Sequence, residues 1–200
     1  MKKRRKYRGK SNGFGFVFPI LSIIGIGSVI VFSSFYEKSW TYNWNGIRQQ
    51  IRDSVKVAER GWVSSGTIGP GARTPKQLGR RIWLMNNATV PELLKLTEYP
   101  DGTIKTIAYE GLIRKPGSID KAELIIGAIA DTEYPIYFKT GCEAFQMNIG
   151  EYLVDFVLFI DDTDNSPPPP IEFINQFRLS EAEQEKILIA HRKTPSLWKK

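Results

Sequence analysis

The sequence predicts a mainly α-helical protein in which one N-terminal transmembrane helix precedes a small α-rich domain with at most one short extended segment. Three observations lead to this fold class. The run from Phe14 to Phe35 contains no charged side chain. Helix-start signals recur through the rest of the chain. Apolar residues after those signals repeat at every third or fourth position, which is the period of an α-helix with one buried face.

The uncharged run is long enough to cross a bilayer. As an α-helix it would rise roughly 33 Å, against a hydrocarbon core of about 30 Å. Seven of the 28 Lys and Arg residues precede it, and the positive-inside rule keeps such a tail in the cytoplasm. The expected localisation is therefore the inner (plasma) membrane, with a single pass and an extracytoplasmic domain. A cleavable signal peptide and a buried helix of a soluble protein are the two alternatives.

The basic tail also accounts for the overall charge. The chain has a formal charge of +7, with 28 basic and 21 acidic residues. Removing the seven basic residues of the tail leaves 28 − 7 = 21 basic residues against 21 acidic ones. A nucleic-acid partner requires a basic surface on the folded part, so the composition does not predict one.

Helix starts are predicted where a Ser, Thr, Asp or Asn precedes a Glu or Gln by three positions, because the two side chains can then satisfy each other's free backbone N–H groups. Several of these boxes follow one another at intervals of about 30 residues, a spacing that favours stacked helical hairpins. The boxes are Thr74 with Gln77, Thr89 with Glu92, Asp120 with Glu123, Asn148 with Glu151, and Ser180 with Glu183.

One hairpin can be placed in detail. The segment Ala88 to Lys115 reads ATVPELLKLTEYPDGTIKTIAYEGLIRK, two apolar-periodic stretches around a Pro-Asp-Gly turn. It resembles a bacterial HEAT-type repeat, with Ile104, Ala108 and Leu112 in the stripe of the second helix, whereas the sequence from Tyr134 onward departs from that pattern. The resemblance implies a binding scaffold without chemistry of its own. The expected inner face comprises Leu93, Leu94, Ile107, Ala108 and Leu112.

Breakers and composition divide the chain into successive regions. Gly, Ser and Thr are frequent from Gly61 to Thr74, which predicts a loop, and Ile136 and Phe138 mark the one extended segment. Four consecutive prolines indicate a stiff linker. The predicted regions are a basic tail (1–13), a transmembrane helix (14–35), a juxtamembrane helix and loop (36–74), a HEAT-like helical domain (75–165), a Pro-rich linker (166–170), and a C-terminal helix and tail (171–200).

Few residues indicate chemistry, and no catalytic, cofactor-binding or metal-binding residue is predicted. The single cysteine, Cys142, and the single histidine, His191, could form a nucleophile and base only if the fold brought them together. The acidic residues Asp161 to Asp164 resemble the beginning of a calcium loop, but Pro167 and Phe173 stand where that loop requires a Gly and a Glu.

The sequence therefore favours a non-enzymatic, membrane-tethered scaffold or protein-binding module of the cell envelope, which needs no cofactor and binds a protein partner. One alternative is an envelope hydrolase that uses Cys142 and His191. Another is a subunit that assembles through its transmembrane helix, where Gly25 and Gly27 would allow close packing.

Overall fold

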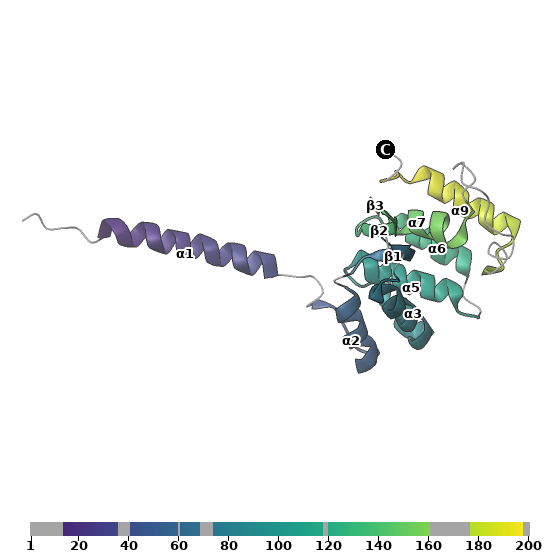
Figure 1. Ribbon diagram of the computed structural model, residues 1–200, viewed down its shortest axis with the longest axis horizontal. Helices are drawn as coiled ribbons and strands as arrows, with labels where there is room; N and C mark the ends of the chain where they lie inside the picture. Colours follow the sequence, from purple (N-terminus) through teal and green to yellow (C-terminus); the bar gives the residue numbers. More distant parts are fainter. Residues whose placement is uncertain are drawn as a thin grey trace, which may run out of the picture. The chain divides into compact units, whose positions relative to one another are not determined.

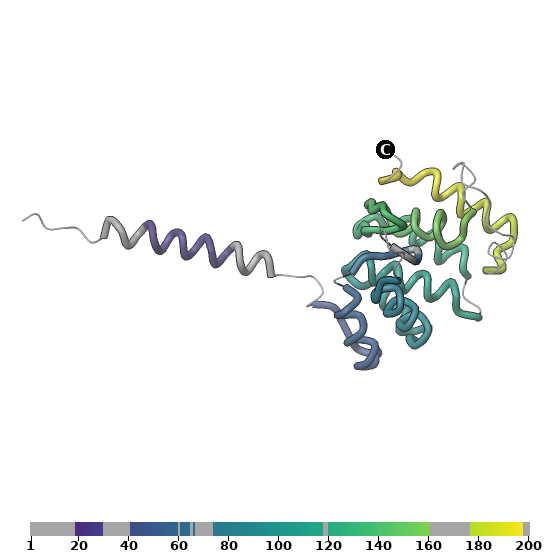
Figure 2. The backbone as a smooth tube through the Cα atoms, in the orientation of Figure 1, coloured from purple at the N-terminus to yellow at the C-terminus, as the bar shows by residue number. Residues whose placement is uncertain are grey.

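A computed structural model describes residues 14–35, 41–59, 61–68, 74–117, 120–160 and 177–197 (Figure 1; Figure 2). The chain divides into two compact units, Met1–Thr41 and Tyr42–Lys200. The first unit holds α1 (Phe14–Phe35), a helix of 22 residues with Pro19 in its interior. All other helices and strands of the described residues belong to the second unit.

The prediction that residues 14–35 form a transmembrane helix has to be corrected. Among the described residues, no helix is both long enough and apolar enough to cross a membrane. The transmembrane part of the predicted fold class is thus wrong, together with the membrane, single-pass and signal-anchor assignments.

The second unit is mainly helical, as the sequence predicted. It contains a small sheet and a six-residue π-helix, η2, in which each N–H bonds five residues back rather than four. In chain order its elements are α2 (Gln49–Ala58), β1 (Val63–Ile68), α3 (Lys76–Asn87), α4 (Val90–Leu96), α5 (Gly102–Arg114), α6 (Lys121–Ala130), β2 (Ile136–Gly141), β3 (Glu143–Met147), α7 (Ile149–Tyr152), η2 (Leu153–Leu158) and α9 (Glu181–Lys193).

The sheet corrects the prediction of at most one extended segment. Its three strands lie in the order β1-β2-β3, with β1 parallel and β3 antiparallel to the central β2. Val63 pairs with Phe138, and Met147 pairs with Ile136. The predicted loop from Gly61 to Thr74 therefore contains a strand. Its Ser- and Gly-rich sequence has no apolar alternation, so the pairing with β2 rather than local propensity makes it extended.

The helix starts follow the predicted boxes in most places. Thr89 with Glu92 and Ser180 with Glu183 form the full reciprocal capping box. Asp120 accepts a hydrogen bond from the backbone of Glu123, and the backbone of Asn148 donates to Glu151. The exception is Thr74, because α3 begins at Lys76 after Pro75, without a side-chain cap.

The central helix, α5, is buried from Gly102 to Ile113. In Figure 1 it runs through the middle of the second unit, with α2 and α3 on one side and α6, α7 and α9 on the other. Each side has its own hydrophobic cluster. The first cluster joins α2, α3 and α4 to Ile104, Ile107, Ala108 and Leu112 of α5. The second joins the sheet, α6, α7, η2 and α9 to Tyr109 and Ile113.

The predicted inner face of the hairpin is confirmed for four of its residues. Leu93, Ile107, Ala108 and Leu112 are buried. Leu94 is 44% exposed, so its placement on the inner face was wrong. Because α4 has only seven residues and Leu at three of them, the periodicity could not decide which Leu faces α5.

Candidate interaction site

A cleft of about 590 Å³ opens where the C-terminal end of α5 meets the first turns of α6 and α9. We refer to it as the α5–α6–α9 cleft. Pro116 ends α5 because it cannot continue a helix, and Gly117 follows with a φ of 150°. On the opposite side, Phe177 is buried at 2% exposure, and the chain continues from it into α9. The cleft is thus built from segments that are distant in sequence.

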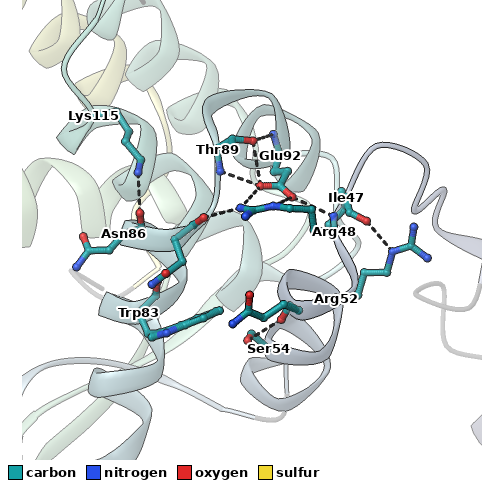
Figure 3. Close-up of polar contacts among 11 residues, drawn as sticks. Ile47, Arg48, Arg52, Ser54, Trp83, Asn86, Thr89, Glu92 and Lys115 are labelled. Carbon is teal, nitrogen blue, oxygen red and sulfur yellow. Dashed lines mark hydrogen bonds and ion pairs between the residues drawn. The ribbon is translucent and has the colours of Figure 1, made fainter.

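Four basic residues line the cleft: Arg114, Lys115, Lys121 and Arg178. The Lys115 Nζ donates to the Asn86 carbonyl oxygen at 3.0 Å (Figure 3), and the Lys121 Nζ donates to the Phe177 carbonyl oxygen at 3.3 Å. Carbonyl oxygens are neutral, so neither contact cancels the charge of the lysine. Arg178 is exposed and has no ion-pair partner among the described residues.

Two carboxylates also line the cleft, and both cap helices. Asp120 Oδ1 accepts a hydrogen bond from the Glu123 backbone N–H at 3.0 Å. Glu183 Oε2 accepts from the Ser180 backbone N–H at 2.7 Å and from the Ser180 hydroxyl at 2.6 Å, and these bonds lower the pKa of Glu183. A carboxylate in a first turn offsets the partial positive charge of that helix N-terminus. The lysines and Arg178 therefore keep most of their charge for an external ligand.

Arg114 connects the cleft to a buried polar network. Its Nε and Nη2 both lie 2.8 Å from Glu110 Oε1, and its guanidinium lies over the Phe177 ring at 5.5 Å. Glu110 is only 1% exposed. It also accepts a hydrogen bond from Tyr152 Oη at 3.0 Å, and Arg81 Nη1 donates to the same Tyr152 oxygen at 2.9 Å. Burial raises the pKa of Tyr152, which keeps it a hydrogen-bond donor. These contacts hold Arg114 in place and fix one wall of the cleft.

A second polar cluster lies at the start of α4 (Figure 3). The buried Glu92 carboxylate accepts bonds from the Arg48 backbone N–H and Nε at 2.9 Å each, and from Arg48 Nη2 at 2.8 Å. The Thr89 backbone and hydroxyl donate to it at 2.8 and 2.9 Å. The Arg48 side chain is the main cause that lowers the pKa of Glu92 to about 2. Arg48 Nη2 also donates to the Asn87 carbonyl oxygen at 2.6 Å. With so many internal donors this cluster has a structural role, because it ties the segment before α2 to α4.

The residues that sequence analysis considered for catalysis lie in different elements. Cys142 is exposed between β2 and β3. His191 lies on α9, and its Nε2 is 3.7 Å from Oδ1 of Asp155 in η2; both side chains are about one-tenth exposed. The Asp161–Asp164 loop and the Pro-rich linker lie outside the described residues. Over the described residues, no three His, Cys, Asp or Glu side chains are grouped as a metal site requires.

Sequence analysis missed both the Asp155 contact and the cleft. Asp155 had a detectable signal, because it is a charged residue inside the apolar stretch Leu153 to Leu158. The basic residues of the cleft had no such signal in the sequence. Arg114 and Arg178 are 64 positions apart (178 − 114), and only the packing of α6 against α9 brings their segments to one opening.

Comparisons of the chain with protein-family models, with curated proteins and with solved structures gave no match.

Proposed function

We propose that residues 42–200 form a non-enzymatic protein-binding module. The observation that carries this proposal is the composition of the α5–α6–α9 cleft, whose lining consists of cations, capping carboxylates, glycine and apolar residues. Among the lining residues that the structure describes, none is a Ser, Thr, Cys or His, and the two carboxylates serve helix caps. A hydrolase that acts through a Ser, Thr or Cys nucleophile needs a base in hydrogen-bond reach of it, and the described lining offers neither that nucleophile nor a histidine.

The resemblance of residues 88–115 to a HEAT-type repeat adds support, since such repeats bind proteins through surfaces of stacked helices. In this chain α5 is buried on all sides, so the second helix of the hairpin has no free face for a partner. We assign the contact surface instead to the cleft at the end of α5, where the ends of three helices meet.

The experiment is chemical crosslinking and affinity capture with the full-length chain, expressed at native level in its own cells. We expect one or a few proteins to be enriched over a bait of equal size and charge, with crosslinks at Lys115 or Lys121. No reproducible protein partner under gentle conditions would overturn the proposal. So would a hydrolytic activity of the purified chain that disappears in the Cys142→Ser and His191→Ala variants.

A further inference from the structure

We propose that the α5–α6–α9 cleft binds an acidic segment of a partner protein, an assignment that rests on the proposed function. The charge of the cleft is the first argument. Among the described residues, Lys115 and Lys121 donate hydrogen bonds to neutral carbonyl oxygens and form no ion pair, and Arg178 contacts no acid. The chain is otherwise neutral beyond its basic tail, so this concentration of positive charge is local and not a result of overall composition.

The cleft is also prepared for binding. Arg178 lies between Phe177, which is buried, and Leu179, which packs against the hydrophobic cluster of α6 and α9. Its backbone is thereby fixed while its side chain remains exposed. Arg114 is held by Glu110 and by the Phe177 ring. Arg114 is therefore already ordered and loses little conformational entropy when a ligand binds, which favours specific contact.

The mixed lining favours a peptide over a nucleic acid. An acidic peptide brings carboxylates for the lysines and Arg178, and it brings backbone N–H donors for the unused lone pairs of Asp120 and Glu183. A DNA backbone brings only acceptors and negative charge, so unlike a peptide backbone it offers no N–H donor to those two carboxylates. Pro116 and Leu179 add apolar surface suited to a side chain of the peptide. At about 590 Å³, the cleft is in the size range of ligand sites and accommodates a short segment.

The direct test is a titration of the full-length chain with a fluorescein-labelled, Glu-rich peptide that carries one central Phe. A Gln-rich peptide of the same length and a single-stranded oligonucleotide of the same charge are the comparison ligands. We expect the Glu-rich peptide to bind more tightly than either, with an affinity that falls as salt is added. Amide shifts in a heteronuclear NMR spectrum should concentrate at Lys115, Lys121 and Arg178.

Charge variants test whether peptide binding depends on the cleft or only on the overall charge of the chain. Arg178→Glu should weaken binding of the Glu-rich peptide about tenfold or more, and Arg178→Gln should weaken it less. Lys56→Glu is the matched control, since Lys56 is exposed on α2, which lines no part of the cleft. Unchanged melting temperatures would show that all three variants fold. Equal weakening by Arg178→Glu and Lys56→Glu would overturn the proposal, and so would tighter binding of the oligonucleotide or of the Gln-rich peptide.

The outcomes also distinguish this inference from the proposed function. If the cells yield a specific protein partner that Arg178→Glu still binds with unchanged affinity, the protein-binding function stands and the cleft assignment fails. If the peptide binds in the cleft as expected but no partner is recovered, the affinity of the cleft for acidic peptides stands and the proposed protein-binding function fails.

Discussion

The two helices of the central hairpin, α4 and α5, differ in how they meet solvent and in the state of their first carboxylates. α5 is buried from Gly102 to Ile113, whereas α4 buries Glu92, Leu93 and Leu96 and exposes Leu94.

The carboxylate at each helix start shows the contrast most clearly. Glu92 accepts hydrogen bonds from Arg48 and Thr89, and its pKa falls to about 2. Asp101 precedes α5 and accepts a bond from the Ile104 backbone at 2.9 Å. Burial outweighs that bond and raises the pKa of Asp101 to about 6. The difference teaches that burial alone favours the protonated acid, and that several donors including a guanidinium reverse the effect.

The largest expected effect compares the two faces of the hairpin. Leu112 of α5 is fully buried, so Leu112→Ala should lower the free energy of unfolding by about 2–5 kcal/mol, through lost burial and the remaining cavity. Leu94→Ala on the exposed face of α4 should change it by no more than about 0.5 kcal/mol. Urea denaturation of both variants measures the difference. An unchanged midpoint for Leu112→Ala would show that the α5 face is assigned wrongly.

The next effect concerns the close contact at the start of α5. A Cβ at Gly102 would lie 2.5 Å from the Tyr134 carbonyl oxygen and 2.8 Å from that of Pro135. Both atoms belong to the backbone and can shift only with their segment, so Gly102→Ala should destabilise by about 3 kcal/mol. Gly79→Ala in α3 is the control, because nothing lies within 4 Å of its added Cβ. That variant should gain about 0.5–1 kcal/mol from helix propensity. Equal melting temperatures for Gly102→Ala and Gly79→Ala would contradict the close contact at Gly102.

The start of α4 can be tested by removing one charge. Glu92→Gln keeps the shape of the side chain but removes a carboxylate that accepts hydrogen bonds from several donors. It should therefore lower the free energy of unfolding by about 2 kcal/mol. Glu98→Gln, at an exposed position after α4, should leave stability nearly unchanged. In the wild type, the contribution of Glu92 should be complete above its unfolded pKa of about 4.5 and should be lost as the pH falls toward 2. Urea denaturation repeated across this pH window should show a weaker dependence of the unfolding free energy on pH in Glu92→Gln than in the wild type. An equally steep pH dependence in the variant would assign the acid sensitivity to another group.

Asp101 should produce the smallest effect, a change of stability with pH that is opposite in sign to that of Glu92. Its folded pKa of about 6 lies above the unfolded value of 3.8, so the folded state binds the proton more tightly. Stability should therefore rise as the pH falls from about 7 to 4, by an amount on the order of 1 kcal/mol after solvent screening. Asp101→Asn should abolish this rise while it keeps the cap on α5. A direct titration by NMR that places Asp101 below pH 4 would contradict the assignment.

Sequence patterns could predict those structural features that depend only on residues close together in the chain. The boxes at Thr89 and Ser180 were found because both members lie within three positions and act on the same helix end. β1 was missed because its sequence, VSSGTI, has no strand periodicity and is extended only through β2. The cleft was missed for the same reason, since its walls come from three helices that no local pattern relates.

The parallel pairing of β1 with β2 has a consequence for the kinetics of folding. Val63 and Phe138 are 75 positions apart (138 − 63), and the whole of α3, α4, α5 and α6 lies between them. Closing so long a loop is entropically costly until the intervening helices have shortened it. The hairpin of α4 and α5 is therefore expected to form early and the sheet late. Substitutions in the hairpin core should mainly slow refolding, whereas substitutions at Val63 should mainly speed unfolding.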